Sequence, residues 1–161
     1  MRNSDLINNA LNYQLRIETN NLQKEPMRQL VIVSCMDSRL DIFKIFSLGS
    51  GQAHIVRNAG GVITEDVLRS IAISQRKLNT NEIIVMQHLD CGLKILDDDE
   101  FLDEIENLGG ERPAWKTHAF KDSRANMIGS LELIKNAPYI NSENLVGLLI
   151  NETTGEVEKV E

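Results

Sequence analysis

Leu30-Val-Ile-Val-Ser-Cys-Met-Asp-Ser-Arg39 is the stretch that decides the fold. Its apolar first half is short, and polar residues do not alternate with the apolar ones. This is typical of a strand that is buried on both faces. A second such run, Ile83-Ile-Val-Met-Gln87, ends directly before His88-Leu-Asp-Cys-Gly92. Each run therefore predicts a buried strand that carries a polar motif at its carboxyl end.

Around these two runs the chain alternates between strand-like and helix-like patterns. Five segments have the apolar content and turn-forming borders of strands: 30–34, 53–57, 82–87, 145–150 and, as an antiparallel edge strand, 156–160. Five others have helical apolar spacing, N-cap residues or acidic first turns: 4–19, 41–48, 64–78, 97–107 and 122–136. This order is typical of βαβ units, so we predict an α/β fold with a mostly parallel central sheet of four to five strands flanked by helices.

The composition limits the class of protein. With 161 residues and 42% hydrophobic content, we expect residues 1–161 to form a single domain, from which a helical arm extends over about residues 4–19. The net charge of −7 argues against broad binding to nucleic acids or to anionic membranes. No apolar run approaches membrane-spanning length, and residues 1–5 lead into an Asn-rich amphipathic stretch, so we expect a soluble, cytoplasmic protein.

Both cysteines of the chain and one of its three histidines lie in the two motifs: Cys35, His88 and Cys91. The carboxyl ends of parallel strands meet at one edge of a sheet, where ligands bind. Two thiolates and an imidazole suit zinc, and three protein ligands leave a fourth position for water, as in catalytic zinc sites. The alternative is two buried thiols and a hydrogen-bonded core histidine, which does not explain why all three residues follow strands. The pattern therefore predicts a metal centre.

The spacing of the first motif adds a charged pair. Side chains alternate along an extended segment, so Cys35, Asp37 and Arg39 can point the same way. Arg39 can hold the Asp37 carboxylate in a two-pronged ion pair, which keeps it ionised and away from the metal. A released Asp37 can instead take the fourth metal position and exclude water. We predict that this pair is an on/off gate; the alternative is a structural ion pair that caps a turn.

The third candidate segment follows the strand expected over 53–57. The backbone amides of Asn58, Gly60 and Gly61 are candidates for holding a small anionic product, because glycine allows close approach. Turn formation is the simpler role for these glycines. Arg57 either faces the pocket or pairs with an acid elsewhere.

Taken together, these motifs resemble the β-class carbonic anhydrases, which are zinc enzymes that hydrate carbon dioxide reversibly. Their pattern of Cys-x-Asp-x-Arg followed by His-x-x-Cys matches residues 35–39 and 88–91, and residues 57–60 match a further family segment. The resemblance is strong over about residues 28–95. It implies one Zn²⁺ per subunit on Cys35, His88 and Cys91, a zinc-bound hydroxide as nucleophile and an Asp37–Arg39 pair beside it. It also implies a homodimer or a dimer of dimers, in which the arm over about 4–19 is a candidate for wrapping the partner.

Two departures from the family pattern bear on branch and substrate. Gly49 stands where the plant-type branch has a substrate-binding glutamine, so the chain resembles the shorter microbial branch. Leu89 stands where many members have threonine, which changes the polarity beside the metal. One alternative keeps the site but acts on carbonyl sulfide or carbon disulfide. Another is a zinc-binding or redox-sensing protein without turnover, in which Asp37 fills the fourth position.

Overall fold

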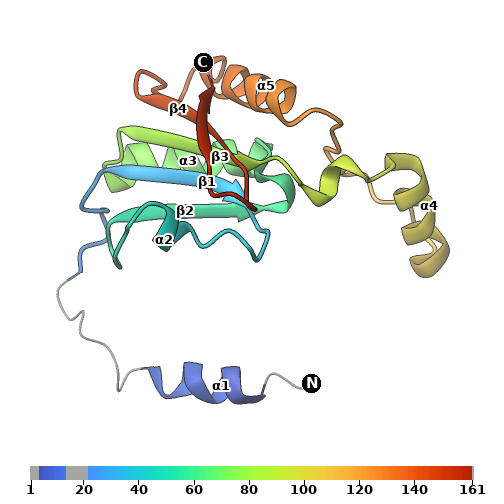
Figure 1. Ribbon diagram of the computed structural model, residues 1–161, viewed down its shortest axis with the longest axis horizontal. Coiled ribbons are helices and arrows are strands. Elements are labelled where there is room, and N and C mark those ends of the chain that lie inside the picture. Colours follow the sequence, from blue (N-terminus) through green and yellow to red (C-terminus); the bar gives the residue numbers. More distant parts are fainter. Residues whose placement is uncertain (1–3, 14–21, 161) are drawn as a thin grey trace.

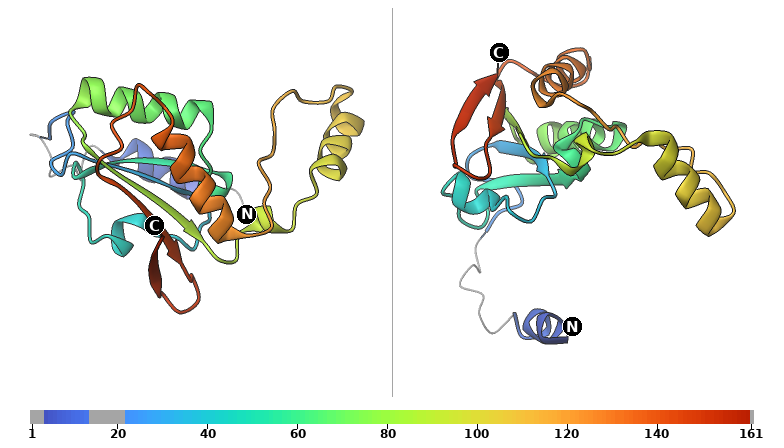
Figure 2. Two further views of the ribbon diagram at one scale, coloured as in Figure 1. Left: turned by 90° about the horizontal axis from the view of Figure 1, so that it is seen from above. Right: turned by 45° about the vertical axis from the view of Figure 1, so that its right-hand side comes forward.

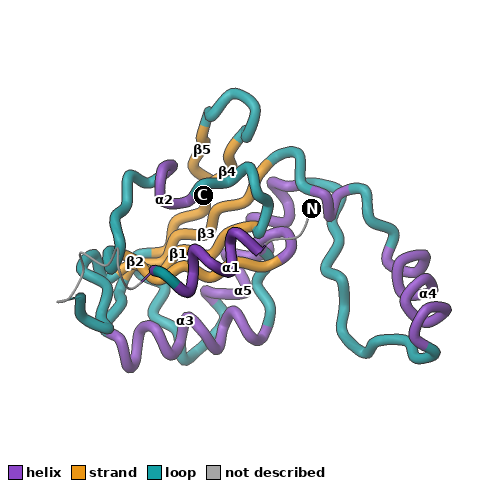
Figure 3. The backbone as a smooth tube through the Cα atoms, turned by 90° about the horizontal axis from the view of Figure 1, so that it is seen from below, coloured by secondary structure: helices purple, strands orange, loops and turns teal. Residues whose placement is uncertain are grey.

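The structure is a computed structural model that describes residues 4–13 and 22–160 (Figure 1). Its centre is a five-stranded sheet in the order β2-β1-β3-β4-β5 (Figure 3). The strands are β1 (Leu30–Cys35), β2 (Ala53–Asn58), β3 (Glu82–His88), β4 (Leu145–Ile150) and β5 (Val157–Val160). Strands β1 to β4 are parallel and β5 is antiparallel to β4, so the predicted mostly parallel α/β sheet is confirmed.

Among the described residues, five α-helices precede or connect strands β1 to β4. They are α1 (Ser4–Leu11), α2 (Ile42–Ile45), α3 (Glu65–Leu78), α4 (Asp98–Gly109) and α5 (Ser123–Lys135), with short 3-10 turns at η2 (Ala59–Gly61) and η3 (Gly92–Lys94). The caps explain where the long helices begin: Thr64, Asp97 and Asp122 each accept a hydrogen bond from a backbone N–H of the first turn. No helix among these described segments is long and apolar enough to cross a membrane.

The side chains of β1 alternate between two apolar clusters, which explains its uninterrupted apolar sequence. Val31 and Val33 belong to the cluster that α3 and α5 cover, whereas Leu30 and Ile32 belong to the cluster on the α2 side (Figure 1). The second cluster continues through the apolar residues that surround the two cysteines. The core therefore extends directly to the predicted metal centre.

The chain changes winding direction at β1. From β1 it passes to β2 on one side, and from β2 it crosses to β3 on the other side. Cys35 ends β1 and His88 ends β3, and these two strands are direct neighbours. In open α/β sheets, ligands bind at such a switch point beyond the carboxyl ends of the strands.

One of the predicted helices is shorter than expected, and another is described only in part. The segment predicted over 41–48 forms only the single turn of α2, because Ser47 adopts a left-handed φ of 51° and the chain leaves the helix there. Of the arm expected over 4–19, α1 ends at Leu11, and residues 14–19 lie outside the described residues. In Figure 1 and in the right-hand view of Figure 2, α1 lies apart from the sheet.

Candidate metal centre

Cys35, His88 and Cys91 converge at the switch point. Cys35 and His88 are the last residues of β1 and β3, and Cys91 follows in the turn that precedes η3. One ligand atom from each lies within 4.8 Å of the other two, and all three residues are buried. Within residues 4–13 and 22–160, no other group of three or more such side chains has this geometry.

The hydrogen bonding of His88 indicates that Cys35, His88 and Cys91 suit a metal ion. Its Nδ1 faces a carboxylate, whereas its Nε2 is buried and no atom of the described residues forms a hydrogen bond with it. A buried polar nitrogen without a partner is costly, and a metal ion would provide the missing contact. Two sulfurs and one imidazole nitrogen are donors that zinc prefers.

The two thiols differ in acidity. Burial raises the pKa of Cys91 to about 11, and the nearby Cys35 adds to the shift. Burial also acts to raise the pKa of Cys35, but the adjacent His88 imidazole and the backbone amides of Asp37 and Gly60 outweigh it and lower the pKa overall. Two adjacent thiolates repel each other, so a cation beside them would favour the state in which both are ionised at neutral pH.

Asp37 and Arg39 form a two-pronged ion pair beside this group. Arg39 donates from Nε to Oδ1 of Asp37 at 3.0 Å and from Nη2 to Oδ2 at 2.8 Å, and its backbone N–H also donates to Oδ1. These hydrogen bonds hold the pKa of Asp37 well below its usual range. Oδ2 of Asp37 lies 3.9 Å from Nε2 of His88, so the ionised carboxylate borders the ligand group.

Arg57 supports the first motif from β2. Its guanidinium donates to the carbonyl oxygens of Cys35 and Asp37, at 3.0 Å and 2.8 Å. The sequence left its role open between the pocket and a distant acid; the structure shows contacts with backbone carbonyls instead. Arg57 thus holds the backbone that carries both the candidate metal ligand Cys35 and the acid Asp37.

The Asn58–Gly61 segment lies against the candidate metal centre. Its three candidates for holding an anionic product, Asn58, Gly60 and Gly61, have different surroundings. The side chain of Asn58 closes the local turn through two hydrogen bonds with the backbone of Val62. Gly60 lines the cavity beside the cysteines. Gly61 has a φ of +60°, and a Cβ there would lie 2.7 Å from the backbone nitrogen of Cys35. The close packing of this turn is what brings it to the metal centre.

A cavity of about 250 Å³ opens onto the ligand group. Its lining is largely apolar, with one acid at its edge: Cys35, Met36, Asp37, Ala59, Gly60, Cys91, Gly92, Leu93 and Leu96. Such a space suits a small, uncharged molecule beside a metal ion.

Sequence reasoning did not identify two acids that contact the site. Asp90 accepts a hydrogen bond from Nη1 of Arg39 at 3.0 Å, and its side chain is exposed. Glu152 follows β4, and its buried Oε1 lies 3.2 Å from Nδ1 of His88. The one sequence signal for Glu152 was its position just after a predicted strand, at the edge where the motifs meet.

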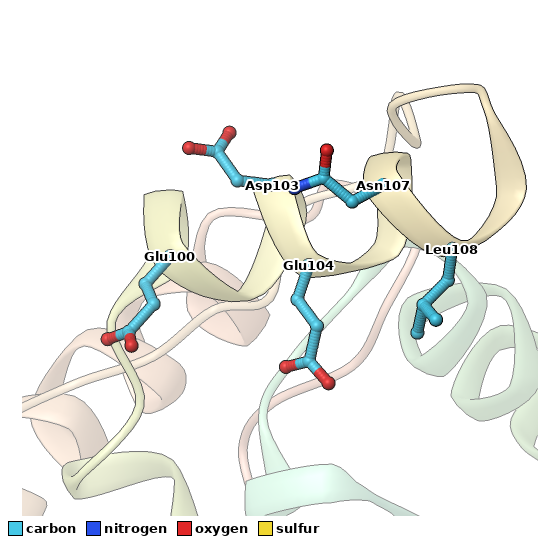
Figure 4. Close-up of a pocket in the computed structure, with 5 residues that line it drawn as sticks. All are labelled: Glu100, Asp103, Glu104, Asn107 and Leu108. Carbon is cyan, nitrogen blue, oxygen red and sulfur yellow. The ribbon is translucent and has the colours of Figure 1, made fainter.

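A second hollow lies on α4, which stands away from the sheet (Figure 2). Glu100, Glu104 and Leu108 project to one side of the helix, and Asp103 and Asn107 complete the lining (Figure 4). Arg112 pairs with Asp103. The cysteines and His88 do not contribute to this hollow, so it is separate from the metal centre.

Comparison with known proteins identifies the family. A family model described as carbonic anhydrase matches residues 30–157. The chain is 39% identical to β-carbonic anhydrase 1 of Mycobacterium tuberculosis over 140 residues, and the alignment covers 86% of each chain. It is 41% identical over 81 residues to carbon disulfide hydrolase of Saccharolobus solfataricus, covering 48% of this chain and 40% of that protein.

A solved structure agrees with the sequence matches. Carbonic anhydrase from Streptococcus mutans superimposes with a TM-score of 0.88 at 33% identity, covering 100% of this chain and 99% of the other. The matched residues include both motifs and the strands that carry them. The chain therefore belongs to the carbonic anhydrase family, in its β class.

Proposed function

We propose that this chain hydrates carbon dioxide reversibly to bicarbonate as a zinc-dependent carbonic anhydrase, with one zinc ion per subunit bound by Cys35, His88 and Cys91. The observation that carries the proposal is the convergence of these three ligand atoms within 4.8 Å beside the Asp37–Arg39 pair. Zinc bound there acts as a Lewis acid and lowers the pKa of water to roughly 7, so that a nucleophile exists at neutral pH.

Asp37 has the role of orienting that nucleophile. Its Oδ2 borders the ligand group, and Arg39 keeps the carboxylate ionised, so Asp37 accepts a hydrogen bond rather than donating one. The two-pronged contact with Arg39 also keeps Asp37 from moving to the fourth metal position. Release of this pair would let Asp37 take that position, which is the gate that we propose.

The apolar wall of the cavity has the role of admitting carbon dioxide and limiting the access of water. Leu93 and Leu96 form part of that wall, and Gly60 brings the backbone close to the cysteines. A role for Asn58, Gly60 and Gly61 in holding bicarbonate stays a prediction. Of these three, Gly60 is the residue that lines the cavity.

A stopped-flow assay with carbon dioxide, carbonyl sulfide and carbon disulfide, each supplied separately, tests the proposal. We expect rapid hydration of carbon dioxide, loss of activity on removal of zinc by a chelator, and recovery when zinc is restored. The similarity to a carbon disulfide hydrolase supports one alternative, in which the same site acts on carbonyl sulfide or carbon disulfide. Strong turnover of the sulfur compounds with little hydration of carbon dioxide would favour that alternative.

A zinc-loaded protein with no turnover of any of the three gases between about pH 7 and 9, the range around the pKa of zinc-bound water, would contradict both enzyme assignments. The chain would then be a zinc-binding or redox-sensing protein, with Asp37 as the fourth ligand. Elemental analysis of the same sample separates this outcome from simple loss of metal.

We also propose that the protein is a homodimer or a dimer of dimers. On α1, Leu6, Ile7 and Leu11 are more than half exposed although all three are apolar. An exposed apolar helix face of this kind is typical of an interaction surface, which supports a partner subunit there. The cytoplasmic location stays a prediction.

A further inference from the structure

Glu152 is a buried acid beside the metal centre that the proposed function does not use. It lies two positions after the end of β4, in the turn that leads to β5. Its side chain is 2% exposed, whereas residues 153–155 of the same turn are exposed. Within the turn, Oδ1 of Asn151 accepts hydrogen bonds from the backbone N–H groups of Thr153 and Thr154. Burial of a carboxylate is costly, so its contacts must explain its place.

One oxygen of Glu152 contacts three groups of the site. Oε1 lies 3.2 Å from Nδ1 of His88 and accepts a hydrogen bond from the backbone N–H of Asp90 at 3.0 Å. The same oxygen lies 3.4 Å from Nη2 of Arg39. Glu152 therefore contacts the metal-ligating histidine, the backbone between His88 and Cys91, and the guanidinium that holds the acid of the gate.

The contact with Nδ1 determines which nitrogen of His88 is free to bind metal. An ionised carboxylate only accepts hydrogen bonds, so Nδ1 carries the proton and donates it to Glu152. The lone pair is then on Nε2, which is the buried nitrogen without a hydrogen-bond partner. The backbone sets the same alignment, because His88 of β3 pairs with Ile150 of β4 immediately before the turn that carries Glu152.

We infer that Glu152 is a positioning residue for the metal centre, which fixes the tautomer and ring orientation of His88 and, through Arg39, the guanidinium that holds Asp37. The inference rests on the proposed zinc site and adds a residue to it. A carboxylate that orients a ligating histidine raises metal affinity, and its loss typically lowers affinity 10- to 100-fold. A role confined to the β4–β5 turn would change folding stability and leave zinc affinity unchanged.

Zinc affinity of matched variants tests the inference without relying on activity. Glu152→Leu removes the acceptor at similar volume, and Glu152→Gln keeps an acceptor oxygen without the charge. Glu156→Leu is the control, because Glu156 is an exposed acid of the same hairpin and contacts Thr154. Competition with a chromophoric chelator gives each zinc dissociation constant, and the visible spectrum of the cobalt-substituted protein reports the ligand geometry.

We expect Glu152→Leu to bind zinc roughly 10- to 100-fold more weakly than wild type and to shift the cobalt bands. Glu152→Gln should recover most of the affinity, and Glu156→Leu should match wild type. If Glu152→Leu does not fold, Glu152→Asp replaces it: the shorter side chain draws the oxygen away from Nδ1, so zinc binding should again weaken.

Wild-type zinc affinity and an unchanged cobalt spectrum in a folded Glu152→Leu or Glu152→Asp protein would overturn the inference, whatever happens to thermal stability. The proposed function fails differently, when wild type binds zinc but hydrates no carbon dioxide. Failure of wild type to bind zinc would overturn the site on which both depend.

Discussion

Arg39 is the residue at which the polar contacts of the site meet. Its guanidinium lies within 3.4 Å of three acids, Asp37, Asp90 and Glu152, yet its side chain is 45% exposed. Solvent screens exposed ion pairs, so these contacts add little to the free energy of unfolding. Their main effect is to fix the positions of the side chains. An arginine that is open to solvent is consistent with the gate that we propose, in which Arg39 releases Asp37.

Replacing Asp37 should separate metal binding from turnover. We expect Asp37→Ala to keep one zinc per chain and to lose roughly 10²-fold or more of kcat/KM for carbon dioxide, because the nucleophile is no longer oriented. Asp66→Ala is the control, since Asp66 pairs with Arg69 on the surface of α3. Stopped-flow hydration and zinc analysis of the same samples measure both effects. Full activity in Asp37→Ala would rule out the proposed role.

Zinc binding should release protons. In the metal-free site, the pKa of Cys91 is about 11, chiefly through burial. The pKa of His88 is also raised, since the contacts with Cys35 and Glu152 outweigh the opposing effect of burial. Cys91 binds zinc as a thiolate and His88 binds it through an unprotonated ring nitrogen, so zinc affinity should rise with pH, with release of at least one proton per zinc at neutral pH. Titration calorimetry in buffers of different ionisation enthalpy counts them. A pH-independent affinity would contradict this assignment of protonation states.

At the scale of the elements, the strands and the two motifs were predictable because their signals are local. The uninterrupted apolar runs before Cys35 and His88 identified β1 and β3, and N-caps such as Thr64 identified the starts of the long helices. The length of α2 was not predictable, because the left-handed turn at Ser47 interrupts an apolar spacing that continues to Leu48.

The contacts of the acids were not predictable for a different reason. Arg39 and Asp90 are 51 positions apart, and His88 and Glu152 are 64 apart. Periodicity describes neighbours along the chain, whereas these pairs depend on which strands become neighbours in the sheet. Without the order β1-β3-β4, nothing in the sequence brings Glu152 to His88.

The η2 turn should tolerate no side chain at Gly61. A Cβ there would lie 2.7 Å from the nitrogen of Cys35 and 2.9 Å from the carbonyl carbon of Ser34, at a φ that side chains rarely adopt. We expect Gly61→Ala to lower the free energy of unfolding by about 2–4 kcal/mol in denaturant titrations. Gly109→Ala is the control: nothing lies within 4 Å of its added Cβ in α4. Gly109→Ala should raise the free energy of unfolding by about 0–1 kcal/mol, because alanine favours the helix more than glycine does. Equal stability of both variants would contradict the close packing.

At the scale of the whole molecule, apolar surface is distributed unevenly. Both α3 and α5 cover one face of the sheet, whereas on the other face the described helices contribute the single turn of α2 (Figure 1). Phe43 of α2 is half exposed, and Ile55, Ile84 and Leu148 of the sheet are only partly buried on that side. These partly exposed residues, with the apolar residues of α1, are candidates for the subunit interface that we propose.

Charges on the apolar face of α1 should weaken the assembly. We expect wild type to have a mass in light scattering of at least twice the 18.1 kDa of one chain. Glutamates at Leu6, Ile7 and Leu11 together should shift the mass toward that of one chain, because buried charges at an interface are costly. The control places glutamates on the opposite face of the helix, at Asn8, Asn9 and Asn12. A monomeric wild type, or equal masses for both variants, would contradict the proposed arm.

Cys35, His88 and Cys91 together should bind one zinc ion, and X-ray absorption at the zinc edge measures that coordination. For protein with one zinc per chain, we expect two sulfur neighbours at about 2.3 Å and one imidazole nitrogen at about 2.0–2.1 Å, with one sulfur lost or the zinc absent in Cys91→Ala. A zinc shell without sulfur, or a wild-type shell that persists in Cys91→Ala, would contradict this assignment of ligands.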